Sequence, residues 1–116
     1  MNPLAEIKCV PCREGAEPVT LAEIDEFLPF IPDWQIIERA GIPRLERAFE
    51  FKDFAEAMAF TDRIAALAEQ EGHHPVLITE WGRVTVAWWT HKIKGLHRND
   101  FIMAAKTDER LKTPAA

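Results

Sequence analysis

The chain has 116 residues, of which 47% are hydrophobic and 28% are charged, and these values are typical of one globular domain. Its 14 Lys and Arg residues against 19 Asp and Glu residues give a formal net charge of -5, which opposes binding to phosphate backbones and argues against a nucleic-acid partner. No apolar run approaches the roughly 20 residues of a membrane-spanning helix. The first residues also lack the basic and apolar segments of a secretory signal, so we expect a cytoplasmic protein with no membrane partner.

The two ends of the chain differ from its middle. Residues 1–18 contain three prolines and a glycine without apolar periodicity, and residues 113–116 cannot pack much. We expect a loosely ordered N-terminal arm over 1–18, one domain over 19–112 and a tail over 113–116. Cys9 and Cys12 form a C-x-x-C motif that suits a metal knuckle or a redox pair, but no second such motif accompanies it, so two reduced thiols are the simpler interpretation.

The first half of the chain predicts a short helix followed by a hairpin. Thr20 and Glu23 form a capping-box pattern, and an apolar helical face continues until Pro29. Residues 33–38 and 45–51 are typical of strands, the second with strict alternation, and a glycine and a proline between them supply the turn.

The second half predicts a longer helix, another hairpin and a final helix. The longer helix begins at Asp53 and ends at Gly72, with apolar residues at helical spacing between them. Residues 76–80 and 83–91 form the second predicted hairpin, and the final helix covers 97–111.

The predicted order of elements is therefore α-β-β-α-β-β-α. Two hairpins separated by a helix do not easily form a parallel sheet, and the amphipathic helices need a surface to cover. We expect an α+β fold with a single four-stranded antiparallel sheet and three helices packed on one face. The open face and the edges of such a sheet are available to a ligand or a partner chain.

All four histidines lie between residues 73 and 97. His73 and His74 stand where the long helix gives way to a strand, and Pro75 favours an extended conformation there. His91, at the end of the last predicted strand, reaches the same cavity if the hairpin strands run side by side. Imidazole has an ordinary pKa of about 6.5 and exchanges protons near neutrality, so three of them in one cavity predict acid–base chemistry.

A carboxylate accompanies the histidine pair. Glu69 lies four residues before His73, where it would orient an imidazole or meet a polar substrate edge, and a solvated helix charge is an equal alternative. A competing interpretation is a zinc site made of Glu69 and the three histidines. Adjacent histidines rarely offer the geometry of an i, i+4 pair, so we favour acid–base chemistry and expect no metal.

The most specific motif is the run His73-His74-Pro75 followed at this distance by Thr90-His91. Supporting pieces occur in the same order along the chain: Trp34, residues 49–54, the spacing of Ala57 and Phe60, residues 68–72, residues 79–89, residues 93–101 and the pair Ala104-Ala105. Together they resemble the pterin-4a-carbinolamine dehydratase family over roughly residues 20 to 110, and in particular its bacterial branch associated with phenylalanine hydroxylation.

The resemblance implies a hydro-lyase that converts a 4a-hydroxytetrahydropterin into a quinonoid dihydropterin and water. Such an enzyme recycles the pterin cofactor of an aromatic amino acid hydroxylase, and that hydroxylase is a further expected partner. The dehydratase itself needs no metal or cofactor, because the tetrahydropterin derivative is its substrate. The resemblance implies acid and base roles for His73 and His91, and a role in holding the pterin for His74. The other pocket residues that it implies are Glu69, Thr90 and Asp100, although Asp100 could equally be only a helix-terminal charge.

Three positions depart from the family pattern. Gly72 stands where relatives often have an acidic or amide residue, and Val76 stands where they often have an acidic one. His97 stands where many relatives have Thr or Ser, and we expect a surface or capping role for it instead of a fourth imidazole in the site. None of these changes removes a proton-transfer group.

The aromatic residues of the second hairpin bear on assembly. Large aromatics beyond the needs of a core are favoured at interfaces, so Trp81, Trp88 and Trp89 indicate a homo-oligomer, with core packing as the alternative for Trp88. The resemblance suggests a dimer or a dimer of dimers. A non-catalytic dimeric scaffold or regulatory binding protein on the same fold is the alternative function, and retention of the three motif histidines argues against it.

Overall fold

The computed structural model describes residues 3–8 and 17–111. Three helices and four strands follow one another along the chain: α1 Leu21–Phe27, β1 Gln35–Arg39, β2 Ile42–Glu50, α2 Phe54–Glu71, β3 Val76–Glu80, β4 Arg83–Trp88 and α3 Arg98–Leu111. Short 3-10 helices cover Pro3–Glu6, Leu28–Phe30 and His91–Ile93. The order α-β-β-α-β-β-α is the predicted one.

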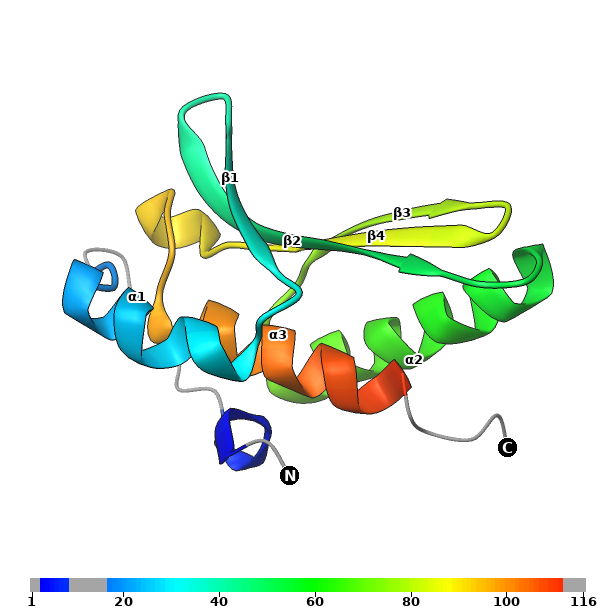
Figure 1. The fold of residues 1–116 in the computed structure, drawn as a ribbon, viewed down its shortest axis with the longest axis horizontal. Coiled ribbons are helices and arrows are strands. Elements are labelled where there is room, and N and C mark those ends of the chain that lie inside the picture. Colours follow the sequence, from blue (N-terminus) through cyan, green and yellow to red (C-terminus); the bar gives the residue numbers. More distant parts are fainter. Residues whose placement is uncertain (1–2, 9–16, 112–116) are drawn as a thin grey trace.

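The four strands form one antiparallel sheet in the order β1-β2-β4-β3, so β2 and β4 are its centre and β1 and β3 its edges. Leu45 of β2 pairs with Trp88 of β4, and Val76 of β3 pairs with Ala87 of β4. All three helices lie along one face of the sheet (Figure 1). The expected α+β fold is therefore confirmed.

The ends of the helices follow the side-chain chemistry that predicted them. Before α1, the Glu23 N–H donates to Thr20 Oγ1 at 3.1 Å, and the Thr20 N–H donates to Glu23 Oε1 at 3.0 Å. Before α2, the Glu56 N–H donates to Asp53 Oδ1 at 2.9 Å. After α2, Gly72 adopts a left-handed conformation with φ of 65°. These contacts confirm the predicted starts of both helices and the predicted end of α2.

The core lies between the sheet and the helices. Alternate side chains of β2 and β4 point into it, and apolar faces of α2 and α3 cover them. Its fully or almost fully buried members include Leu45, Phe49, Phe60, Ile64, Leu67, Val84, Val86, Trp88, Phe101, Ile102 and Met103.

The strands of both hairpins differ in extent from their predictions. The first turn lies at Ala40 and Gly41, whose φ values of 52° and 78° are both positive as in a type I′ turn, so β2 begins at Ile42. Strand β4 ends at Trp88 because the chain then forms a tight loop. The Thr90 N–H donates to the Gly95 carbonyl at 2.8 Å and closes that loop. The end of the predicted strand at residue 91 is therefore wrong.

Part of the N-terminal arm is packed. The 3-10 helix Pro3–Glu6 lies against α3, its Leu4 side chain is buried, and Lys106 Nζ donates to the Ala5 carbonyl at 2.8 Å. Cys9 and Cys12 lie outside the described residues, as does the tail over 113–116. Within the described residues, no helix combines the length and the apolar character needed to cross a membrane.

Candidate active site

His73 enters the site through the chain reversal at the end of α2. The N–H groups of Gly72 and His73 both donate to the Ala68 carbonyl, and the left-handed Gly72 turns the chain off the helix axis. The imidazole of His73 then lies 2.7 Å from a carboxylate of α3, measured from Nε2 to Asp100 Oδ1. The His73 side chain is only 11% exposed and that of Asp100 is fully buried.

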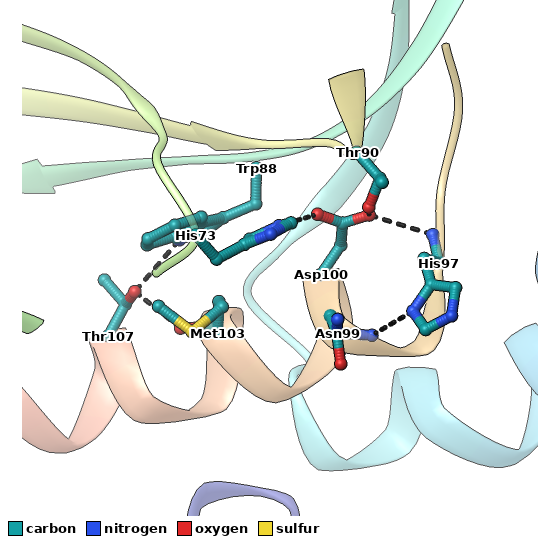
Figure 2. A network of polar contacts seen from close by, with 8 residues as sticks. All are labelled: His73, Trp88, Thr90, His97, Asn99, Asp100, Met103 and Thr107. Carbon is teal, nitrogen blue, oxygen red and sulfur yellow. Dashed lines mark hydrogen bonds and ion pairs between the residues drawn. The ribbon is translucent and has the colours of Figure 1, made fainter. Parts of the chain in front are cut away.

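Asp100 is the centre of the hydrogen-bonded group in Figure 2. Its Oδ2 atom accepts from Thr90 Oγ1–H and from the His97 backbone N–H, both at 2.8 Å, while Oδ1 faces His73. The carboxylate also occupies the first turn of α3, where the helix dipole favours an anion. Asp100 is therefore more than a helix-terminal charge, because it joins the predicted site residues His73 and Thr90.

His97 caps α3 and supports this carboxylate. Its Nδ1 accepts from the Asn99 N–H at 3.0 Å, and its own backbone N–H donates to Asp100, so side chain and backbone form a reciprocal cap like a capping box. Burial lowers the pKa of His97 below its ordinary value, against the opposing effect of the Asp100 charge. The neutral ring required by an accepting Nδ1 is thereby favoured, and the predicted capping role is confirmed.

His91 stands apart from the group around Asp100. It begins the 3-10 helix after Thr90, its side chain is exposed, and its ring stacks on Trp89 with centroids 4.4 Å apart at an angle of 17°. Its neighbour Thr90 belongs to the Asp100 group, so His91 lies one residue along the chain from it. Among the described residues, no hydrogen bond joins His91 to the His73–Asp100 pair, so the structure does not bring His91 into the group around Asp100.

Glu69 pairs with His74 and not with His73. Glu69 Oε2 lies 2.5 Å from His74 Nε2, and both side chains are well exposed, at 77% and 61%. The expected alignment of Glu69 with His73 used helical spacing, which no longer applies beyond the left-handed Gly72. The pair is open to solvent and therefore accessible to a ligand.

The contact with Asp100 can fix which ring nitrogen of His73 carries the hydrogen. An ionised carboxylate only accepts hydrogen bonds, so the Nε2 atom of His73 carries a hydrogen towards Asp100. Nδ1 is then the ring nitrogen left for proton exchange with a ligand. Among the described residues, no group of three or more His, Cys, Asp and Glu side chains has the arrangement of a metal site, so the competing zinc interpretation finds no support there.

Sequence reasoning missed the packing around the two tryptophans. Trp88 is buried and parallel to His73, with ring centroids 5.8 Å apart at an angle of 14°. Trp89 is only 8% exposed, and its ring contacts both Arg44 and His91. Strand alternation gave a signal for Trp88 but none for Arg44. Trp88 follows the core-packing alternative stated for it, Trp89 is also covered within the chain, and Trp81 is 73% exposed.

Comparisons with known proteins identify the family of this chain. The sequence profile of a family described as pterin 4 alpha carbinolamine dehydratase matches residues 17–110. A protein of Syntrophotalea carbinolica is 60% identical over 111 residues, which cover 96% of this chain and 99% of that protein. A protein of Chlorobium limicola is 57% identical over 107 residues, covering 92% of this chain and 95% of that one. Both carry the provisional name pterin-4-alpha-carbinolamine dehydratase.

Two solved structures share the fold. The crystal structure of a transcriptional coactivator/pterin dehydratase from Brucella melitensis has a TM-score of 0.73 and 33% identity, and the match covers 81% of this chain and 98% of that one. A pterin dehydratase-like protein identified as a RuBisCO assembly factor in the alpha-carboxysome has a TM-score of 0.59 and 25% identity, with 71% and 93% covered. From the profile match and the relatives together, the chain belongs to the pterin-4-alpha-carbinolamine dehydratase family.

Proposed function

We propose that this protein dehydrates 4a-hydroxytetrahydropterins to quinonoid dihydropterin and water, and so returns the pterin cofactor of an aromatic amino acid hydroxylase to use. The observation that carries the proposal is the pairing of His73 with the buried Asp100 at 2.7 Å in a chain of this family. A buried carboxylate against an imidazole fixes the orientation of the ring, as a proton-transfer group requires.

The reaction needs two proton transfers and no electrons. One proton is added to the C4a hydroxyl, which leaves as water, and one is removed from ring N5 as the C4a–N5 double bond forms. His73 and His91 divide these two transfers in the proposal. The proposal includes no redox cofactor, because dehydration neither oxidises nor reduces the pterin. It includes no metal, because imidazole exchanges protons near neutral pH.

The remaining predicted residues divide between holding the substrate and fixing the His73 ring. The Glu69–His74 pair is exposed and carries both donors and acceptors, which suits the polar edge of a pterin. Thr90 and Asp100 act from the protein side by fixing the His73 ring. Asp100, which the resemblance implies as a pocket residue, is therefore a positioning residue in this proposal.

Assembly of the protein belongs to the same proposal. A homodimer or a dimer of dimers would cover Trp81, which is exposed at the turn between β3 and β4. Strands β1 and β3 supply unpaired edges for such contacts.

A second candidate is a non-catalytic scaffold on the same fold. The observation that favours it is the likeness to a RuBisCO assembly factor and to a transcriptional coactivator/pterin dehydratase. In that case the histidines would be dispensable, and the function of the fold would be to bind another protein.

Absorbance changes during dehydration of enzymatically generated 4a-hydroxytetrahydropterin distinguish the two candidates. We expect purified protein to accelerate the reaction, chelator treatment to leave the rate unchanged, and His73→Ala to lower kcat by about 10²- to 10⁴-fold. A folded protein that does not exceed the spontaneous rate would remove the dehydratase proposal and favour the scaffold.

A further inference from the structure

Two consecutive tryptophans at the end of β4 each lie parallel to one of the imidazoles assigned to catalysis. Trp88 stacks with His73 at a centroid distance of 5.8 Å, and Trp89 stacks with His91 at 4.4 Å. Trp88 is the last residue of β4 and Trp89 follows it directly, so the two imidazoles pack against different indoles of one short stretch of chain. Each imidazole thus has an aromatic surface of its own.

The indole of Trp88 is fixed from α3. Its Nε1–H donates to Thr107 Oγ1 at 3.0 Å, and Thr107 Oγ1–H in turn donates to the Met103 carbonyl at 2.6 Å (Figure 2). Trp88 and Thr107 are both fully buried. Because a buried indole N–H is costly to leave unpaired, this chain of hydrogen bonds holds the ring plane against which His73 lies.

The indole of Trp89 is fixed from β2. The guanidinium carbon of Arg44 lies 4.0 Å from the Trp89 ring centroid, which is cation–π geometry. The Nε atom of Arg44 is buried and has no hydrogen-bond partner among the described residues. The Trp89 ring is thus a contact of the Arg44 guanidinium, whose Nε–H stays unpaired within the described part of the chain.

We propose that Trp88 and Trp89 are positioning residues that hold His73 and His91 in the orientation needed for proton transfer, with Thr107 and Arg44 fixing the two indoles. This inference rests on the proposed dehydratase function. Positioning matters most for His91, because its side chain is exposed on a short loop and would otherwise sample several rotamers. Small displacements of a catalytic group can cost about 10²-fold in rate.

NMR tests the position of the His91 ring independently of activity. Protons above an aromatic ring resonate upfield, so the His91 ring signals should move downfield in Trp89→Leu and stay nearly in place in Trp89→Phe. Trp81→Leu is the matched control, because Trp81 is an exposed tryptophan of the same hairpin. His91 signals that do not move in folded Trp89→Leu would overturn the proposal.

Kinetics test the consequence. We expect Trp89→Leu to lower kcat by about 10- to 10²-fold with little change in KM, and Trp89→Phe to restore most of it. Arg44→Leu should lower kcat less than Trp89→Leu does, and Arg44→Lys should recover the loss because it keeps a cation over the ring. Trp81→Leu should keep wild-type turnover. A folded Trp89→Leu protein with unchanged kcat would overturn the proposal even if its His91 signals move.

Trp88 is central to the core, so replacing it could unfold the protein. A change at Thr107 is therefore the safer test of how Trp88 positions His73. Thr107→Val removes the acceptor of the Trp88 N–H and should shift the His73 ring signals and lower kcat, whereas Thr107→Ser should preserve both. Unchanged His73 signals and kcat in folded Thr107→Val would overturn this half of the proposal. If wild-type protein shows no turnover, the proposed function fails, and the NMR shifts alone then support or overturn the positioning of the two rings.

Discussion

Replacing Asp100 with asparagine separates the structural role of this residue from its role in proton transfer. Asn retains one carbonyl oxygen, which can still accept from Thr90 Oγ1–H and the His97 N–H at the place of Oδ2. Its amide group then faces His73 Nε2, where the carboxylate oxygen was. Because an amide N–H is a donor, the neutral ring must carry its proton on Nδ1 instead of Nε2.

The expected losses differ in size. Hydrogen bonds to a charged group contribute about 1 kcal/mol more than neutral ones, so weakening the three bonds to Asp100 should lower the free energy of unfolding by about 2–3 kcal/mol. Small domains have about 5–15 kcal/mol in total, so Asp100→Asn should fold. The wrong ring tautomer removes the proton acceptor from the substrate side, and we expect kcat to fall by about 10²- to 10⁴-fold.

Three measurements check this prediction. Urea unfolding gives the change in stability, absorbance gives turnover, and nitrogen-15 spectra of the imidazole rings give the tautomer of His73. Asp108→Asn is the matched control, because Asp108 also lies on α3 and accepts hydrogen bonds from Arg47 at 2.7 Å and Trp34 at 2.9 Å. It should lose stability while keeping turnover. Wild-type turnover in Asp100→Asn, or a His73 ring still protonated on Nε2, would refute the reasoning.

Three further changes test other parts of the structure. Burial lowers the pKa of His97 in the folded state, so below an ordinary pKa of about 6.5 the unfolded chain binds a proton that the folded chain does not, and stability present above that pH is lost as the pH falls. His97→Ser removes the titrating imidazole and keeps a capping oxygen. Because the imidazole is gone, the free energy of unfolding of this variant should decline less between about pH 7.5 and 5.5 than that of wild type, and an equal decline would contradict this assignment. Gly72→Ala should cost about 1 kcal/mol in urea unfolding, because φ is positive and the added Cβ meets nothing within 4 Å; no loss would mean that Gly72 leaves the left-handed region. Leu4→Ala should cost about 2 kcal/mol, since Leu4 is buried, and an unchanged free energy of unfolding would show that the segment is not docked on α3.

Local chemistry explains why much of the fold could be predicted from the sequence. The caps at Thr20 and Asp53 and the left-handed Gly72 depend on residues within a few positions of each other, and all three occur where the sequence predicts them. The end of β4 depends instead on the pairing of Thr90 with Gly95, which closes a loop that apolar alternation alone does not reveal. Strand ends were accordingly the weaker part of the prediction.

The sequence predicted which residues belong to the candidate site better than it predicted which of them touch. Asp100 lies 27 positions from His73, so their pairing depends on how α3 packs beside the end of α2. The Glu69 carboxylate went to His74 because helical spacing stops at Gly72. Arg44 carries no motif, and its place over Trp89 follows only from the pairing of neighbouring strands.

In the proposed reaction, His73 and His91 together supply the proton transfers of dehydration. The rate of 4a-hydroxytetrahydropterin dehydration by the His73→Ala, His91→Ala double variant, measured beside wild type and the spontaneous reaction, tests this division of roles. We expect wild type to exceed the spontaneous rate by at least about 10²-fold and the folded double variant to return to it. A folded double variant that keeps wild-type turnover would contradict the account.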